Sequence, residues 1–460
     1  MQRNWLQVAG IVLLLLLGVC APILYSGYSE LRQAQIAGSP LEVAEHYKAA
    51  ARRIPWRADL YELAGHAYYH AKDYPLADEM YQIAEDRNAL SPEGWVAWGD
   101  VNYLHGDPVR AAEIWESAFG RGDISTSLYS RLAKINQERE DYSLAAQFLQ
   151  KYVSVHSDDA SARYRLGLLL TLSDPQAAIT ELIAASQLDP QFDPAARTLR
   201  TALNLALLTE SRSDGFVITG RGLGLVEEWE LARAAFQSAV DADGENAEAW
   251  AWLGEADQQT GGDGGEELDR ALQLNPNSST VRGLRGLYFQ RVSNHRQALI
   301  EFQTAASLEP ENPARFVTLG DAFANVGDLI RALEAFQYAT TLAPEDPAYW
   351  HALAKFCGQN GVNIADVGIP AAQRALVIDT NDPASEDLLG WLWLINGSHP
   401  DAERHLLRAL ELDPQYAAAH LHLGMLYLQT GDRDRALNHL SAARDLGDAD
   451  ASVLLEQYFP

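Results

Sequence analysis

Apolar and small residues recur along this chain at the spacing expected of paired helices. In the segment 316–344, FVTLGDAFANVGDLIRALEAFQYATTLAP, apolar positions fall at helical spacing over 316–323 and again over 332–339. Gly327 and the aspartate after it interrupt the pattern and favour a turn, and Pro344 ends the second run. The pattern therefore predicts two antiparallel helices that approach closely through their small residues.

The same pattern returns along most of the chain. One small residue marks each copy, and seven of the ten steps between successive copies are 34 residues long; these residues are Gly65, Gly99, Ala133, Gly167, Gly220, Gly254, Gly286, Gly320, Ala354, Gly390 and Gly424. A fixed period of this length is typical of a solenoid in which helical hairpins stack on their neighbours.

Aromatic and alanine positions recur in phase with the small ones. A bulky residue opens the first helix, as at Trp95, Phe216 and Trp350, and an alanine lies in the second helix, as at Ala111 and Ala332. On these residues the sequence resembles the tetratricopeptide repeat family from about Leu41 to the C-terminus. The resemblance implies an all-α fold, a right-handed superhelical solenoid of stacked antiparallel helix pairs, with the first helices lining a groove where ligands bind.

Breaks in the period suggest the domain organisation. The step from Gly167 to Gly220 is 53 residues, which predicts an additional helix at about 194–208. The last residues read as a short amphipathic helix that would cap the stack. We expect an N-terminal anchor or uncleaved signal at 1–28, an N-terminal repeat array at 29–190, an extra helix or hinge at 191–213, a C-terminal repeat array at 214–447 and a capping helix at 448–460.

The N-terminal residues predict one transmembrane helix before the repeats. The run from Trp5 to Tyr25 contains no charged residue and is long enough to cross roughly 30 Å of hydrocarbon. Arg3 precedes it, so we expect a single-pass protein of the cytoplasmic membrane, with its N-terminus inside and its repeats on the extracytoplasmic side. A cleaved signal peptide and a lipidated Cys20 are alternatives, and both also export the repeats.

Charge narrows the choice of partner. The formal net charge of −28 disfavours nucleic acid and favours basic or apolar partners. The two cysteines, Cys20 and Cys357, suggest no intramolecular disulfide framework. We therefore expect a protein or peptide partner, with the membrane contacted through the N-terminal helix.

The resemblance also places candidate binding residues on the first helices. Near the N-terminus it gives an acidic and aromatic groove of Asp59, Glu62, His66, Tyr69, His70, Glu93, Asp100 and Tyr103. Near the C-terminus it gives an apolar peptide groove of Trp391, Leu394, Ile395, Leu421, Met425 and Leu428. The corresponding hypothesis is a peptide or helix that lays its apolar face in the C-terminal groove while basic residues are attracted to the acidic end.

No catalytic motif is present, so we expect no enzyme, no cofactor and no metal site. Glu62, His66 and His70 are spaced four residues apart, but a solvated polar helix face explains them better than a metal site does. The predicted function is a membrane-anchored extracytoplasmic scaffold that organises an envelope or membrane-associated complex. The alternative is an extracytoplasmic binding protein for a glycan or another non-protein ligand, held by groove aromatics such as Trp391.

Overall fold

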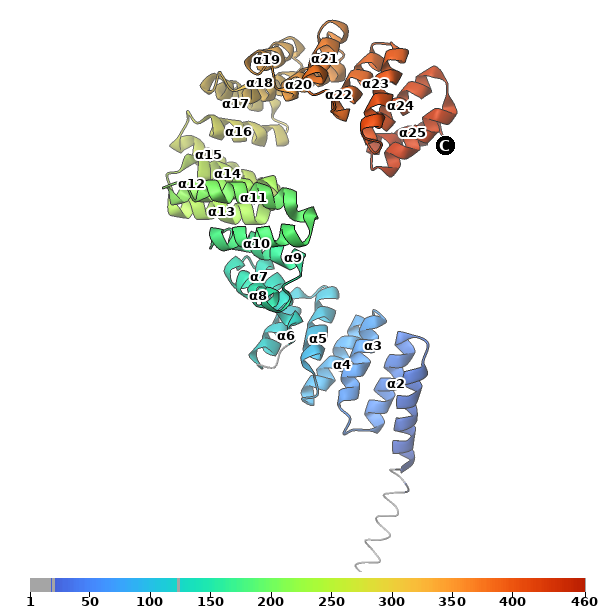
Figure 1. Cartoon of the computed structure of the whole chain (residues 1–460). Helices are drawn as coiled ribbons and strands as arrows, with labels where there is room; N and C mark the ends of the chain where they lie inside the picture. The colour runs from blue at the N-terminus through green and yellow to red at the C-terminus, as the bar shows by residue number, and fades with distance from the viewer. Residues whose placement is uncertain (1–17, 19–20, 122–124, 460) are drawn as a thin grey trace, which may run out of the picture. The chain divides into compact units, whose positions relative to one another are not determined.

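The computed structural model describes residues 18, 21–121 and 125–459. This part of the chain is helical throughout and contains no strand, and its helices follow one another as hairpins (Figure 1). Two compact units are present, the N-terminal unit Met1–Leu208 with Leu225–Glu227 and the C-terminal unit Thr209–Gly224 with Glu228–Pro460. The expected all-helical repeat solenoid is therefore present in both units.

In the N-terminal unit, a helix over residues 21–36 precedes the first labelled helix. The helices that follow are α2 (Pro40–Arg53), α3 (Asp59–His70), α4 (Tyr74–Asp86), α5 (Pro92–Leu104), α6 (Pro108–Gly120), α7 (Ser127–Glu138), α8 (Tyr142–Val155), α9 (Ala160–Leu170), α10 (Pro175–Leu188), the 3-10 turn η1 (Pro190–Phe192) and α11 (Asp193–Ala206). From α3 to α10, the odd-numbered helix opens each hairpin and the even-numbered helix closes it.

The helices of the C-terminal unit continue the series. They are α12 (Arg212–Leu225), α13 (Trp229–Ala242), α14 (Ala247–Gln259), α15 (Gly265–Leu274), α16 (Ser279–Arg291), α17 (His295–Leu308), α18 (Pro313–Asn325), α19 (Leu329–Leu342), α20 (Pro347–Asn360), the π-helix η2 (Ile364–Gly368), α21 (Ile369–Ile378), α22 (Pro383–Ile395), α23 (His399–Leu412), α24 (Ala417–Thr430), α25 (Arg433–Asp445) and α26 (Ala449–Tyr458). In this unit the even-numbered helices from α12 to α24 open the hairpins.

Aspartates placed before the second helices explain where those helices begin. Asp107 accepts a hydrogen bond from the backbone N–H of Arg110 at 2.9 Å, and Asp328 accepts one from Arg331 at 3.1 Å. Each satisfies an N–H group that the first helical turn leaves unpaired. The residue before each aspartate is a glycine, and Gly327 adopts a φ of 83°, a left-handed conformation that glycine takes at little cost. These two features form the tight turn between the paired helices.

Close packing within each hairpin depends on the small residue of the first helix. A Cβ atom on Gly320 would lie 2.7 Å from the ring of Phe336, and one on Gly286 would lie 2.5 Å from Phe302. In both hairpins the large residue follows the glycine by 16 positions, which places it opposite the glycine across the helix pair. The recurring glycine therefore makes room for the recurring aromatic ring.

The N-terminal segment differs from its prediction. Residues 1–17 and 19–20 of the expected anchor lie outside the described residues, and the helix at 21–36 packs on α2. Its Glu30 accepts a hydrogen bond from Arg53 at 2.6 Å and pairs with His46 at 2.7 Å. Helix α2, at the start of the predicted repeats, thus forms a hairpin with residues 21–36, some of which were assigned to the anchor.

The predicted membrane localisation is also wrong. Within residues 18, 21–121 and 125–459, no helix combines the length and the apolar composition required to cross a bilayer. This finding contradicts the predicted single-pass placement with the repeats on the extracytoplasmic side.

Two further segments lie where the sequence predicts a departure from the period. Helix α11 occupies the region of the expected extra helix, with Ala196, Leu199 and Leu203 buried. At the C-terminus, α26 begins after the N-cap Asp448 and buries Leu455 against a cluster that contains Leu440. Both helices therefore have an apolar face that packs against the end of a repeat array.

Candidate functional site

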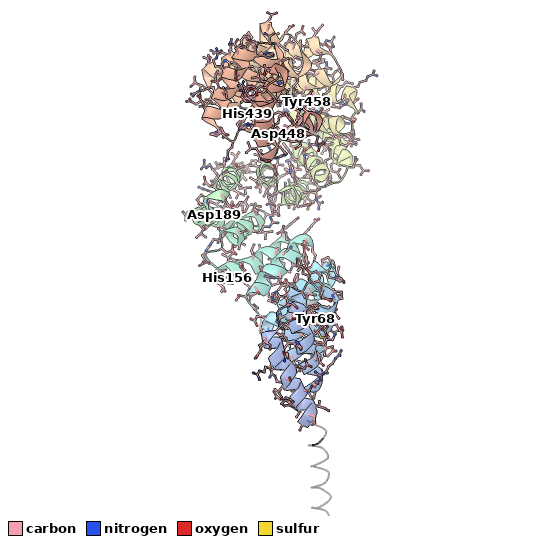
Figure 2. The ribbon with its side chains drawn as sticks, turned by 90° about the vertical axis from the view of Figure 1, so that its right-hand side faces the viewer. Tyr68, His156, Asp189, His439, Asp448 and Tyr458 are labelled. Carbon is pink, nitrogen blue, oxygen red and sulfur yellow. The ribbon has the colours of Figure 1, made fainter. Side chains whose placement is uncertain are left out.

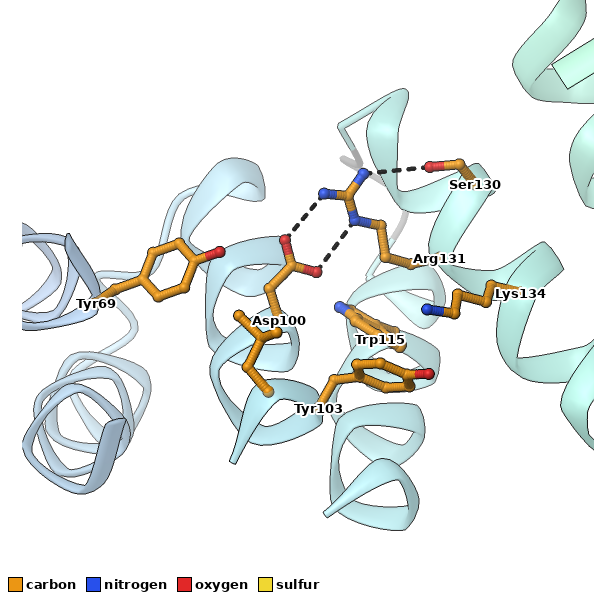
Figure 3. A pocket seen from close by; sticks show the side chains of 8 residues that line it. Tyr69, Asp100, Tyr103, Trp115, Ser130, Arg131 and Lys134 are labelled. Carbon is orange, nitrogen blue, oxygen red and sulfur yellow. Dashed lines mark hydrogen bonds and ion pairs between the residues drawn. The ribbon is translucent and has the colours of Figure 1, made fainter. Parts of the chain in front are cut away.

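A pocket of about 420 Å³ opens on the first helices of three consecutive hairpins in the N-terminal unit. Its lining combines aromatic, apolar and charged side chains from α3, α5, α6 and α7: Tyr69, Asp100, Tyr103, Leu104, Trp115, Ser130, Arg131 and Lys134 (Figure 3). Because neighbouring hairpins contribute to one surface, the stacking of the repeats itself forms the pocket.

An ion pair crosses the pocket from α5 to α7. The Arg131 guanidinium donates from Nε to Oδ1 of Asp100 at 3.1 Å and from Nη2 to Oδ2 at 2.9 Å, so both carboxylate oxygens are engaged. A third nitrogen of Arg131 donates to the Ser130 hydroxyl at 3.2 Å. The hydrogen bonds that Arg131 donates to Asp100 raise the pKa of Arg131 further. The pair is therefore a fixed, charge-assisted contact within the wall of the pocket.

Aromatic rings form the neighbouring wall. The Tyr103 ring lies 6.0 Å from the Trp115 ring, and the Lys134 ammonium lies 4.2 Å from the centroid of the Tyr103 ring. The Tyr103 hydroxyl donates to Glu138 at 2.7 Å, and the Trp115 indole donates to the Val96 carbonyl at 3.2 Å. Both polar tips are satisfied, so the rings are held in place and present apolar surface to the pocket.

Tyr69 of α3 forms the remaining wall of the pocket. Its hydroxyl is directed toward Asp100 (Figure 3), and burial, with a smaller contribution from the Asp100 charge, raises the pKa of this phenol. The side chain is therefore uncharged at neutral pH and offers one hydroxyl to an occupant. The electrostatic character of the pocket differs from the acidic groove expected from the sequence, because Arg131 neutralises Asp100 and Lys134 adds a further positive charge.

The predicted acidic-groove residues divide into three groups. Tyr69, Asp100 and Tyr103 share the pocket. Glu62 and His66 instead belong to a network between hairpins, in which Glu62 accepts from the backbone N–H of Ser91 at 2.7 Å and His66 Nδ1 lies 2.8 Å from the Tyr81 hydroxyl. The remaining members are exposed outside the pocket: Asp59, which pairs with Arg57, and His70 and Glu93.

Burial and hydrogen bonding act in opposite directions on Glu62. Burial raises its pKa, but the hydrogen bonds from His66 and Ser91 outweigh burial and lower the pKa overall. This carboxylate therefore joins two hairpins, and its role in the network is structural. Among the residues that the structure describes, no group of three or more His, Cys, Asp or Glu side chains has an arrangement suited to a metal ion.

The predicted apolar groove near the C-terminus is divided between core and surface. Leu394 is 2 % exposed in a cluster with Leu423 and Leu426, whereas Leu421 is 8 % exposed in a second cluster with Leu455. Of the other candidates, Ile395 is exposed, and Met425 and Leu428 are half-buried and pack against both clusters.

A polar contact lies beside the remaining candidate, Trp391. Its ring stacks on the His422 ring with centroids 5.7 Å apart, and His422 Nδ1 lies 2.7 Å from Oδ1 of the buried Asp387. A Cβ atom on Gly358 would lie 2.4 Å from the same indole, so the Trp391 ring is packed on more than one side. The packing between successive hairpins therefore covers much of the surface expected to be open.

Several pocket residues are absent from the sequence-based site, namely Leu104, Trp115, Ser130, Arg131 and Lys134. The repeat period contains a signal for one of them, because Lys134 follows Asp100 by one period of 34 residues. Arg131 lies one helical turn before Lys134 and therefore on the same face of α7. The pairing of these positions across two helices is visible only when the repeats are aligned with one another.

Comparison with known proteins agrees with the repeat assignment. Residues 394–455 match the family model of the tetratricopeptide repeat, and no catalytic family is indicated. Superkiller complex protein 3 of Homo sapiens is 21 % identical over 335 residues, which cover 67 % of this chain and 20 % of that protein. The chain thus spans about one fifth of the length of this curated relative.

Two solved structures align with parts of this chain at low sequence identity. The crystal structure of yeast Tom70 aligns over 95 % of both chains with 16 % identity and a TM-score of 0.42. The crystal structure of YrrB, described as a tetratricopeptide repeat protein with an unusual peptide-binding site, aligns over 41 % of this chain and 97 % of its own, with 19 % identity and a TM-score of 0.31.

Proposed function

We propose that this chain of tetratricopeptide-type repeats is a non-enzymatic scaffold that binds protein or peptide partners along the first helices of its hairpins. The observation that carries the proposal is the pocket that α3, α5 and α7 build together. Its rings and its Asp100–Arg131 pair are held by their own contacts before any partner arrives, which lowers the conformational cost of binding.

The lining of this pocket indicates what part of a partner it accepts. Leu104 is 53 % exposed beside the Tyr103 ring, and together they offer an apolar surface for an aliphatic or aromatic side chain. Lys134 and the Tyr69 hydroxyl can donate hydrogen bonds to backbone carbonyls of the same segment. We therefore expect an extended peptide that inserts one apolar side chain.

Site-specific photo-crosslinking tests the proposal in cells. A photoreactive amino acid at Leu104 should crosslink to a partner protein, whereas the same group at Val109, an exposed aliphatic position outside the pocket, should not. The partner identified in this way is then titrated with purified full-length chain by isothermal titration calorimetry. Leu104→Asp should weaken binding at least about tenfold without lowering the melting temperature. Equal crosslinking at both positions, or unchanged affinity, would contradict the proposal.

The alternative of a glycan or another non-protein ligand finds less support in the aromatic rings. The Trp391 ring is packed between the α20 backbone near Gly358 and the His422 ring, so a sugar has little free face to cover. Trp252 is similarly occupied, with Phe236 stacked at 5.9 Å and the Arg221 guanidinium at 5.3 Å. A saturable fluorescence change on adding oligosaccharides, lost in Trp391→Ala, would favour the alternative.

A further inference from the structure

A second pocket, of about 450 Å³, occupies the equivalent repeat position in the C-terminal unit. It lies between α18 and α20, with Phe336 of α19 at its base. The two pockets are related residue by residue, because each of the following pairs is 221 positions apart: Asp100 and Asp321, Tyr103 and Ala324, Leu104 and Asn325, Trp115 and Phe336, Arg131 and Ala352, and Lys134 and Lys355.

One substitution between the two pockets changes their chemistry. In the N-terminal unit the carboxylate of Asp100 is held by Arg131, whereas the position of Arg131 is occupied by Ala352 in the second pocket. Throughout the described part of the chain, no side chain or backbone group forms a hydrogen bond or an ion pair with the side-chain carboxylate of Asp321. The second pocket thus retains the acceptor and lacks the guanidinium that pairs with it in the first pocket.

Asp321 is exposed to solvent at the mouth of the pocket, and the pocket walls surround its carboxyl only in part. This partial burial raises the pKa of the carboxyl. The Lys355 charge lowers the pKa in part, but it acts at longer range than an ion pair. A cation bound directly against Asp321 would therefore stabilise the ionised carboxylate more than it would at an ordinary surface position.

The rest of the lining suits a peptide segment around such a cation. Asn325 and Gln359 are exposed amides that can donate to and accept from a peptide backbone. Asn360 already uses its Nδ2 atom to donate to the Phe356 carbonyl at 3.0 Å, which leaves its amide oxygen as an acceptor. The net charge of −28 on the chain also attracts basic segments.

We propose that the pocket between α18 and α20 binds the basic side chain of a partner peptide, with Asp321 accepting hydrogen bonds from that side chain as Asp100 does from Arg131. The inference rests on the proposed function, since it requires a peptide partner. Arginine suits the site better than lysine, because its planar guanidinium engages both oxygens of a carboxylate, as Arg131 does. The Arg131–Asp100 pair is thus the chain's own example of the contact.

The probe for the test is a capped tripeptide, acetyl-Gly-Arg-Gly-amide. The control is the same peptide with citrulline in place of arginine, because citrulline has nearly the same shape and carries no charge. Binding to the full-length chain is followed by ligand-observed NMR. The arginine peptide should bind at least about tenfold more tightly than the citrulline peptide. Asp321→Asn should abolish that preference, whereas Glu334→Gln, which neutralises an exposed carboxylate of α19 outside the pocket, should preserve it.

Two further variants exchange the residue that distinguishes the pockets. Ala352→Arg should fill the second pocket with an internal guanidinium and abolish peptide binding there. Arg131→Ala should free Asp100, so that the chain gains a second bound peptide. Melting curves check that each variant is folded, and the nearly isosteric Asp321→Asn decides the question if Ala352→Arg does not fold.

Equal binding of the two peptides, or an arginine preference that survives Asp321→Asn, would overturn the inference. The proposed function is judged separately, by the partner that crosslinks at Leu104 in the other unit. If that partner binds while the arginine preference is absent, the scaffold function stands and the basic-side-chain site falls. If the arginine preference depends on Asp321 while no partner crosslinks at Leu104, the site stands and the N-terminal pocket is not the partner-binding surface.

Discussion

Gly99 of α5 lies directly against Trp115 of α6, so closely that a Cβ atom on the glycine would be 2.0 Å from the indole Nε1. That indole is 2 % exposed and donates to the Val96 carbonyl at 3.2 Å. The contact sets the distance between the two helices of this hairpin, because any larger residue at position 99 must displace the ring that forms the base of the candidate pocket.

The first prediction is therefore that Gly99→Ala lowers the free energy of unfolding of the N-terminal unit by about 1–3 kcal/mol. Displacement of Trp115 should also weaken partner binding at the neighbouring pocket. Urea unfolding followed by tryptophan fluorescence measures the loss. The matched control is Gly120→Ala in the last turn of α6, where an added Cβ meets no atom within 4 Å, so stability should hold or rise slightly. Equal losses in the two variants would disprove the contact.

Glu301 provides a second prediction, because it is a buried charge held by two arginines. Its side chain is 1 % exposed, and its oxygens lie 2.9 Å from Arg282 and 2.6 Å from Arg285. Glu301→Ala should cost about 3–5 kcal/mol, since it leaves two positive charges without their shared partner. Glu411→Ala, which removes a 2.8 Å pair with Arg408 on the exposed face of α23, should cost less than about 1 kcal/mol. Chemical denaturation of both variants compares these costs.

A third prediction concerns pH and the contact between His420 and His439, whose Nδ1 atoms lie 3.0 Å apart. His439, which is labelled in Figure 2, lies on α25, and its ring centroid is 5.6 Å from that of Tyr427 on α24. Burial, then the charges of His420 and Arg435, lower the pKa of His439 below its ordinary value of 6.5. A lowered folded-state pKa means that stability is present above pH 6.5 and is lost as the pH falls through the folded-state value.

The comparison of the wild-type chain with His439→Gln isolates this effect. The free energy of unfolding of the wild type should fall more steeply than that of the variant between pH 7 and pH 5, so the difference between the two should narrow on acidification. Hydrogen exchange of α24 and α25 provides a local readout of the same change. Parallel pH profiles for the two proteins would exclude a role for His439 titration.

The fourth prediction is that Cys357 is unreactive in the folded protein. The residue is fully buried between α20 and its neighbours, and burial raises the pKa of its thiol to about 11. In a Cys20→Ser background at pH 8, a thiol reagent should label Cys357 only after denaturant is added. Rapid labelling without denaturant would contradict the packing of this hairpin.

The same thiol predicts a loss of stability in alkali. Because its folded-state pKa is above the ordinary value of 9.0, its contribution is complete below pH 9 and is lost as the pH rises toward 11. Cys357→Ala should lack this component of the alkaline loss. The free energy of unfolding is measured for the wild type and for Cys357→Ala at pH 8 and at pH 10.5. Between these pH values the wild type should lose more stability than the variant.

Local patterns were sufficient to locate the helices. The apolar run at 316–323 falls within α18, the run at 332–339 falls within α19, and the Gly327 break forms the turn between them. These features depend on residues three or four positions apart and on the conformational preferences of single residues. Both can be obtained from the sequence alone. The sequence did not predict that the helix at residues 21–36 packs on α2, because hydropathy does not identify contacts such as that of Glu30 with Arg53.

The sequence predicted the candidate sites less well than it predicted the helices. Leu394 and Leu421 are on the expected first helices, but contacts between successive hairpins bury them in separate clusters. Asp100 was expected to make its groove acidic, and its neutralisation by Arg131 depends on the stacking of α7 against α5. Each outcome follows from the offset and rotation between one hairpin and the next, which a 34-residue period does not specify.

By itself the sequence determined that this protein is a chain of helical hairpins, where most of those hairpins begin and end, and which small and large residues pack within each one. Those properties come from helix periodicity, turn residues and volume, which act over a few tens of residues at most. Only the tertiary structure decided that Arg131 pairs with Asp100 in one pocket, while the Asp321 carboxylate is left unpaired in the equivalent pocket. The physical reason is that charge pairing depends on distances of a few ångströms between helices, which packing sets and periodicity does not.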